Sequence, residues 1–432
     1  MNIPAVLSFS FLGACAGGAP PGELPADQVA LADSPALAHL ARAYPQAGTV
    51  ADLFDRDLQP DTAPDPSAWY SHQRNAHVTL PGLWSGTQLR VLSYNVGLLD
   101  REYLLGRAFV PHLPERRARQ LELLFDDGWD VLILQELWEW HDAQAFARAA
   151  EAAGYAHWLG SEDGHSFHGV GLFVRSELIG STTDQGEVPF DAQRKLEKWP
   201  GPGLERAWLE WSFELAGSGE TMVVMGTHLT PFVDFWHVRD LQARQLGLRV
   251  ASLPADAVVL LGGDLNAGPY YSVDSWVNAA GESVDGFWRN ASTLPLLAHY
   301  GGLVDARVLV NPPDDVVMGD AVPVGGGASY AETPYGSPDF CAEHAGTWTA
   351  TDCNSISFAS YGGDELPSRM DHVLLRDDGG TVRVREGGLA YAEPDPQLGY
   401  EISDHYGAWV MLTIGGAVPV PEPVEPAPAP VE

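Results

Sequence analysis

The stretch VVLLGGDLNAGP, residues 258–269, joins an apolar run to a polar turn. The run from Val258 to Leu261 is typical of a buried strand, and two glycines separate it from Asp264 and Asn266. These two polar residues lie two positions apart, so an extended backbone would place both side chains on one face. The glycines would let the chain approach a ligand closely. The stretch is therefore either an ordinary strand-to-turn junction or one corner of an active site.

Five other apolar runs also carry a polar group at one end. Three of them, LRVLSYN, DVLILQE and MVVMGTH, end in Asn95, Glu136 and His228. Two later runs reverse the order, because DHVLLR begins at Asp371 and SDHYGAWVML begins beside His405. If all of these groups meet at one rim, the last two strands must run antiparallel to the others, which requires mixed sheets. The site would then lie at the strand ends, where loops can place ligands.

Strand-length apolar runs alternate with helical segments through most of the chain. Residues 114–128, 142–154 and 236–253 have helical periodicity. Composition changes at both ends, where proline, glycine and acidic residues accumulate. The predicted parts are a signal peptide with a lipobox-like end (1–15), a tether and N-terminal extension (16–87), a catalytic domain (88–415) and a Pro/Glu-rich disordered tail (416–432).

The N-terminus reads as an export signal. Its apolar core, Ala5–Leu12, is too short to span a bilayer, and the following Cys15 completes a Leu-Gly-Ala-Cys motif that resembles the lipobox of bacterial lipoproteins. No Lys or Arg precedes this core, so we expect either a cell-envelope lipoprotein lipidated at Cys15 or a plainly secreted protein. The other two cysteines, Cys341 and Cys353, would then form a disulfide worth about 3 kcal/mol, with two unpaired surface thiols as the alternative.

The charge balance argues against a nucleic-acid partner. The 432 residues include 58 acidic and 24 basic ones, which gives a formal net charge of −34. Such a surface repels phosphate backbones and gains nothing from counterion release. A bound metal could still invert the field inside one cleft.

The polar groups at the strand ends suit metal-assisted hydrolysis of a phosphoester. Asn95 and Glu136 offer the oxygen ligands that Mg²⁺ or Ca²⁺ takes, and no Cys/His cluster has zinc spacing. Asp371 could hold the ring of His405 in one tautomer so that it takes a proton from water, while His228 could donate to a phosphoryl oxygen. Each residue alone is more often structural than catalytic, but the ordered set favours an active site.

Seven motifs cover nearly all of residues 88–415. They are LSYNVG, DVLILQELWE, GVGLFVRS, GTHLTP, LLGGDLNAGP, SRMDHVLL and ISDHYGAWV. Together they resemble the endonuclease/exonuclease/phosphatase superfamily. The resemblance implies an α/β, DNase I-like four-layer sandwich in which two mixed β-sheets pack face to face with helices outside. It also implies metal binding by Glu136, Asn95 and Asp404.

The same resemblance implies a role for each remaining site residue. Asp264 and Asn266 match the pair that positions water and phosphate, and His405 matches the general base. Asp371 matches the carboxylate that orients the base. His228 matches a histidine of the deoxyribonuclease-I and sphingomyelinase branches.

Among the branches, neutral and bacterial sphingomyelinases of the C type are the most similar. THLTPFVDFWHVRDLQARQLGLRVASL resembles their histidine strand and the following Arg/Gln-bearing helix, and GTWTATDCNSISFASYGGDELPSRMDHVLL resembles their approach to the final strands. Phe235, Trp236 and Tyr270 are candidates for contacting a choline head group by cation–π attraction, or else they pack locally. One departure is His372, at a position often aromatic in the family, where it would pack.

The expected function is that of an exported phosphoric diester hydrolase that splits sphingomyelin into ceramide and phosphocholine. Its expected cofactor is Mg²⁺, with Ca²⁺, Mn²⁺ or Co²⁺ as alternatives. It would act as a monomer on phospholipid at a membrane surface, without nucleic acid. The alternatives are a secreted DNase I-like nuclease or other phosphoesterase of the same fold, and a non-catalytic surface lipoprotein.

Overall fold

A computed structural model describes ten segments of the chain, all within one compact unit, Ala63–Glu432. Predicted features at the two ends, including Cys15 and the disordered tail, lie outside these segments, so the predicted domain boundaries stay predictions. In the described part of the chain, none of the helices is both long and apolar enough to cross a membrane. The described residues are 86–99, 110–160, 168–193, 205–231, 235–267, 276–277, 283–284, 293–310, 353–357 and 369–415.

The first of two six-stranded sheets contains the strands that end at Asn95 and just before Glu136. Strands β1 and β2 run parallel, while β14 runs antiparallel to β1, as the strand-direction argument predicted. In sheet order the strands are β13 (Val382–Ala390), β14 (Gly407–Ile414), β1 (Thr87–Asn95), β2 (Val131–Gln135), β4 (Gly171–Arg175) and β3 (Tyr155–Trp158).

The second sheet repeats this pattern with the strands that end at His228 and Asp264. Strands β7 and β8 run parallel, and β12 runs antiparallel to β8. In sheet order the strands are β11 (Val304–Asp305), β12 (Asp371–Arg376), β8 (Val258–Asp264), β7 (Thr221–His228), β6 (Ala207–Leu215) and β5 (Ile179–Pro189). A separate pair consists of β9 (Trp276–Val277) and β10 (Ser283–Val284).

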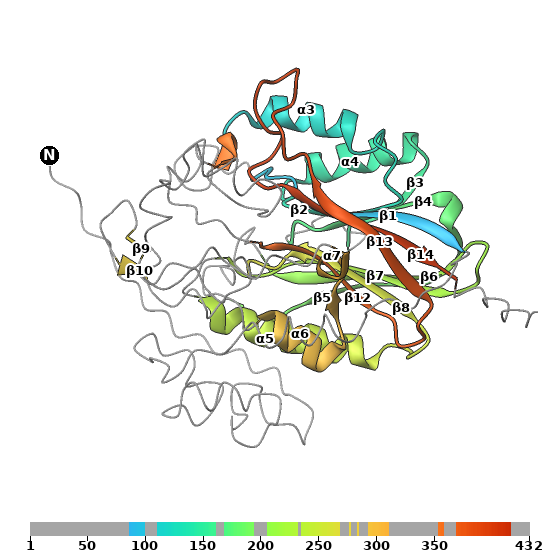
Figure 1. Ribbon diagram of the computed structural model, residues 1–432. Coiled ribbons are helices and arrows are strands. Elements are labelled where there is room, and N and C mark those ends of the chain that lie inside the picture. Colours follow the sequence, from blue (N-terminus) through green and yellow to red (C-terminus); the bar gives the residue numbers. More distant parts are fainter. Residues whose placement is uncertain are drawn as a thin grey trace, which may run out of the picture. The chain divides into compact units, whose positions relative to one another are not determined.

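Helices cover the outer face of each sheet (Figure 1). On the first sheet lie α3 (Leu113–Leu123) and α4 (Trp140–Ala152); on the second lie α5 (Trp236–Ser252) and α6 (Thr293–Gly301). A short helix α7 (Ala306–Val310) and a 3₁₀ turn η6 (Ser176–Leu178) complete the described elements. Helix α3 ends earlier than its predicted segment, because the chain turns to bury Leu124 and Phe125.

Both faces of the first sheet are buried, which explains why its central strands read as continuous apolar runs. Along β1, Val91 packs into the core between the two sheets, and its neighbour Leu92 packs under the helices. Ile133 and Leu132 alternate in the same way along β2. The layers are therefore helices, sheet, sheet and helices, and the predicted four-layer α/β sandwich with two mixed sheets is confirmed.

Glycines let the two sheets approach each other closely beside the site. A Cβ atom on Gly262 would lie 2.6 Å from Cδ1 of Ile133, and one on Gly226 would lie 2.7 Å from Cδ2 of Leu172. Because side chains two positions apart share a face, Asp264 points toward the first sheet just as Gly262 does. From the sequence, Gly262 is predicted to let the chain approach a ligand closely. The structure shows that Ile133 of the opposite sheet lies against Gly262.

Candidate active site

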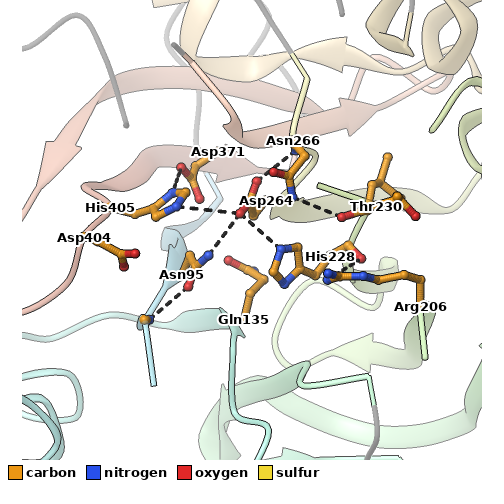
Figure 2. Close-up of polar contacts among 12 residues, drawn as sticks. Asn95, Gln135, Arg206, His228, Thr230, Asp264, Asn266, Asp371, Asp404 and His405 are labelled. Carbon is orange, nitrogen blue, oxygen red and sulfur yellow. Dashed lines mark hydrogen bonds and ion pairs between the residues drawn. The ribbon is translucent and has the colours of Figure 1, made fainter. Parts of the chain in front are cut away.

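Asp264 is the centre at which the two sheets meet (Figure 2). Asn95 Nδ2 donates a hydrogen bond across the sheets to Asp264 Oδ2 at 3.0 Å. The Nε2 atom of His228 lies 3.3 Å from the same oxygen, and that of His405 lies 3.9 Å from it. All four residues are buried. The structure thus brings together polar groups from four of the six predicted runs.

The charges around Asp264 favour an ionised Asp264 and a neutral His228. Burial by itself would raise the pKa of Asp264, but His228 and His405 and a backbone hydrogen bond from Asn266 hold it well below the usual range. Burial, together with the nearby Arg206, lowers the pKa of His228 to about 4. A neutral His228 therefore donates from Nε2 to the carboxylate, and its buried Nδ1 has no hydrogen-bond partner among the described residues.

His405 and Asp371 form a second buried pair. The Nδ1–H of His405 donates to Asp371 Oδ2 at 2.9 Å, which leaves Nε2 directed at Asp264. Burial disfavours the charged ring, but the three carboxylates of Asp371, Asp264 and Asp404 outweigh it and raise the pKa of His405 well above its ordinary value. One potential ligand atom each from Asp264, Asp371 and His405 lies within 4.8 Å of the others.

Asn266 anchors the turn that follows β8. Its backbone is left-handed, with φ 47°, and its N–H donates to Asp264 Oδ1 at 2.9 Å. Its side-chain Nδ2 donates to the carbonyl of Leu229 at 3.0 Å, so the turn is tied to the segment after β7. The predicted role of Asn266 toward water or phosphate stays a prediction, and one of its amide hydrogens is already used within the chain.

Glu136 and Asp404 form the acidic side of the site. Glu136 follows β2 in a left-handed conformation, with φ 64°. Burial raises the pKa of Glu136 to about 8, and the charge of Asp404 adds to the effect. The Ser403 hydroxyl donates to the backbone carbonyl of Asn95 at 2.7 Å and lies 3.2 Å from Asp404 Oδ1, so this side is held beside β1.

A divalent cation suits this acidic side. Glu136, Asp404 and Asn95 offer only oxygen ligands, which hard cations such as Mg²⁺ prefer. Burial, and to a lesser degree the charge of Asp404, raises the pKa of Glu136, so a cation shared by the two carboxylates would stabilise their charged forms. The residues present therefore fit the predicted metal.

Helix α3 fastens two loops of the site, which the sequence did not reveal. Arg116 is fully buried and donates to the carbonyls of Val96, Gly97 and Ile402, at 3.3, 2.7 and 3.3 Å. Gln120 Nε2 donates to two of these carbonyls, those of Val96 and Ile402. The loop after Asn95 and the loop before Asp404 thus share one clamp. The i, i+4 spacing of the two clamp residues was the only signal, and it is common in helices.

Two more polar residues at the site were missed. Gln135 precedes Glu136 and is fully buried, and its Oε1 atom has no hydrogen-bond partner among the described residues. Arg206 is buried with its guanidinium 5.2 Å from the ring centre of Trp138, and its Nη1 lies 3.5 Å from the carbonyl of His228. Gln135 could have been suspected from its neighbour, but nothing in the sequence around Arg206 marks it.

Several other predicted residues are not brought to the site by the described structure. Phe235 is partly buried where α5 begins, and Trp236 is the first residue of that helix, with its side chain outside the described part. Tyr270 and Cys341 also lie outside it. Cys353 is partly buried. Because Cys341 lies outside the described residues, the predicted pairing of the two cysteines stays a prediction, as do the three substrate contacts.

The chain is similar to several known proteins. Residues 92–405 match the model of the Endonuclease/Exonuclease/phosphatase family. No curated protein matches the sequence. Similar solved structures include D. rerio TDP2 complexed with a single-strand DNA product, at 19% identity over 76% of this chain and 99% of that one, with a TM-score of 0.49. An endonuclease/exonuclease/phosphatase from Bacteroides vulgatus is 14% identical over 76% of this chain and 99% of that one, with a TM-score of 0.48. The human Nocturnin catalytic domain is 16% identical over 77% of this chain and 95% of that one, with a TM-score of 0.45.

Proposed function

This chain belongs to the endonuclease/exonuclease/phosphatase family, and we propose that it is an exported Mg²⁺-dependent phosphodiesterase that splits sphingomyelin into ceramide and phosphocholine. Enzymes of this family are metal-dependent phosphodiesterases and nucleases. The single observation that carries the hydrolytic part is the geometry of His405, which Asp371 orients and which faces Asp264 across a short gap.

The gap is the right size for a nucleophilic water. His405 Nε2 lies 3.9 Å from Asp264 Oδ2, which is too long for a direct hydrogen bond and leaves both atoms able to contact one water molecule. Asp264 is ionised and accepts from Asn95 and His228, so its position is held from both sheets. Asp371 keeps Nδ1 of His405 protonated, so that Nε2 is the atom that removes the proton from water.

The acidic side completes the arrangement. Glu136 and Asp404, with Asn95 beside them, would hold the Mg²⁺ ion. Bound there, the ion would neutralise negative charge on the phosphodiester and, by its own charge, oppose protonation of His405. Neutral His228 keeps a hydrogen on Nε2, which it donates to Asp264, and the nearby buried Arg206 adds a positive charge that would attract the phosphodiester.

Two observations support a phospholipid rather than DNA as substrate. The net charge of −34 disfavours a polyanion. The second is the resemblance of two segments to sphingomyelinases. Each of these segments also holds a loop of the site, because Asn354 donates to the carbonyl of Ser403 at 2.9 Å and Arg239 of α5 donates to the carbonyl of Thr230 at 2.9 Å. Both segments therefore hold loops that carry predicted catalytic residues.

A substrate panel tests the proposal. The full chain is incubated with Mg²⁺ or with EDTA, and with sphingomyelin, lysophosphatidylcholine, a phosphatidylinositol phosphate or plasmid DNA. We expect Mg²⁺-dependent release of phosphocholine from sphingomyelin. Cleavage of DNA without release of phosphocholine would refute the lipid assignment.

Variants test the site itself. His405→Ala and Glu136→Ala should each lower the rate at least about 100-fold. The control is His157→Ala, because His157 lies on β3 with its ring beside Phe173, outside the site. If the two site variants keep the wild-type rate on every substrate, the predicted site is wrong.

Export and lipidation form a separate part of the proposal. They rest on the apolar core Ala5–Leu12 and the lipobox-like motif that ends in Cys15. Expression in a bacterium with labelled palmitate should label the protein, and Cys15→Ser should abolish the label. Soluble, unlabelled wild-type protein in the culture medium would instead show plain secretion.

A further inference from the structure

His372 lies beside the catalytic pair but takes no part in it. On β12 it follows Asp371, so the two side chains point to opposite faces of the second sheet. Asp371 faces the site, whereas His372 is buried against Asp305 of β11. His372 is therefore packed in the interior, as expected, and in addition its ring contacts polar partners.

Both ring nitrogens of His372 face hydrogen-bond acceptors. The Nδ1 atom lies 2.9 Å from Asp305 Oδ2, and the Nε2 atom lies 3.0 Å from the backbone carbonyl of Ala267. A carbonyl oxygen cannot donate. Asp305 cannot donate either when it is ionised. Each bond therefore requires its own ring hydrogen.

The surroundings of Asp305 keep it ionised. Burial by itself would raise its pKa, but Arg369, His372 and Arg307 together hold that pKa well below the usual range. Arg369 donates to the same carboxylate oxygen as His372, and the backbone N–H of Arg307 donates to the other oxygen at 3.0 Å. Asp305 is thus a fixed acceptor, and the imidazolium form of His372 satisfies both of its partners.

The carbonyl that His372 holds belongs to the catalytic turn. Ala267 follows Asn266, and the same turn is held at Leu265, whose N–H donates to the carbonyl of Met370 at 2.8 Å. The Asn266 side chain ties it to Leu229. The hydrogen bond from His372 holds Ala267, the last described residue of the turn, on the side away from the first sheet.

We propose that His372 is a positioning residue, whose doubly protonated ring ties the turn that carries Asp264 and Asn266 to the buried Asp305–Arg369 pair. The effect of His372 on catalysis rests on the proposed phosphodiesterase function. The protonation of its ring and its hydrogen bond to the turn do not. A shift of the turn by a fraction of an ångström would move Asp264 relative to Asn95 and His405. Removing a residue that holds a ligand or catalytic group in place typically lowers activity about 10–100-fold.

The first experiment reads the ring without any activity assay. Nitrogen-15 spectra of histidine-labelled full-length protein at neutral pH should show hydrogens on both ring nitrogens of His372. The signals are assigned by their loss in His372→Gln or in His372→Phe. A signal for an unprotonated Nε2 or Nδ1 overturns the proposal, whether or not the enzyme is active.

The second experiment measures the turn and the rate. In His372→Phe, hydrogen exchange should speed up in the peptide that contains residues 264–267, and kcat should fall about 10–100-fold with KM changed less than about threefold. The matched control is His157→Phe, the same replacement on β3 outside the site. Unchanged exchange at 264–267 in a folded His372→Phe variant overturns the proposal. If the wild-type protein is inactive, the proposed function is refuted. The hydrogen exchange of residues 264–267 then still decides whether His372 positions the turn.

Discussion

Gly262→Ala tests whether close approach of the two sheets shapes the active site. The added Cβ would lie 2.6 Å from Cδ1 of Ile133, a distance that real Cβ atoms do not show, and 3.1 and 3.2 Å from Cβ and Cγ2 of the same side chain. Ile133 is fully buried and belongs to the core between the sheets, so it has little room to move. Overpacking of this kind costs about 1–3 kcal/mol. The same strain would push Asp264 away from Asn95, so the rate should fall as well.

Urea unfolding followed by tryptophan fluorescence measures the cost, and a second replacement tests its cause. Ile133→Val removes the Cδ1 atom and alone should cost about 0.5–1.5 kcal/mol. In the double variant the closest clash is gone. The double variant should therefore lose at least about 1 kcal/mol less unfolding free energy than the sum of the losses in the two single variants.

The control is Gly379→Ala, in the turn after β12, where an added Cβ would meet Cγ2 of Thr381 at an ordinary 3.5 Å. Its stability should stay within about 0.5 kcal/mol of wild type. Additive losses from Gly262→Ala and Ile133→Val, or a neutral Gly262→Ala, would refute the reasoning.

Three further predictions concern protons and metal. Asp371→Asn keeps the size of the side chain but removes the charge that orients His405, and kcat for phosphodiester hydrolysis should fall at least about 100-fold while circular dichroism shows an intact fold. Glu136→Gln should raise the Mg²⁺ dissociation constant, measured by calorimetry, at least about 10-fold, and EDTA should abolish wild-type activity until Mg²⁺ is restored. Burial lowers the pKa of His168 from 6.5 to about 3. Below pH 6.5 the unfolded chain therefore binds a proton at this histidine, whereas the folded chain does not. The free energy of unfolding should fall as the pH drops through this window. Relative to His168→Gln, the wild type should lose about 2–3 kcal/mol more unfolding free energy between pH 7 and about pH 4.5; parallel urea-unfolding curves would contradict this.

The general fold could be predicted because its signals are local. Buried strands read as apolar runs, and helices read as periodic patterns, whatever their partners are. The position of each polar group relative to its run also indicated strand direction, since Asp371 begins its strand whereas Asp264 ends one. These directions predicted mixed sheets, and the antiparallel pairing of β12 with β8 confirms the prediction.

The fold class and most of the polar groups of the site could be predicted from short stretches of sequence, because the end of a strand depends on neighbouring residues. Which of these groups meet depends on how the strands pack in three dimensions. Asn95 donates to a carboxylate 169 positions away, and His372 reaches across 105 positions to Ala267. The burial of the Arg206 charge and the role of Gly262 likewise depend on segments that are distant in sequence and packed together in the fold. A side chain's partner, and hence its proton, is set by what folding places next to it, and no short stretch of sequence encodes that neighbour.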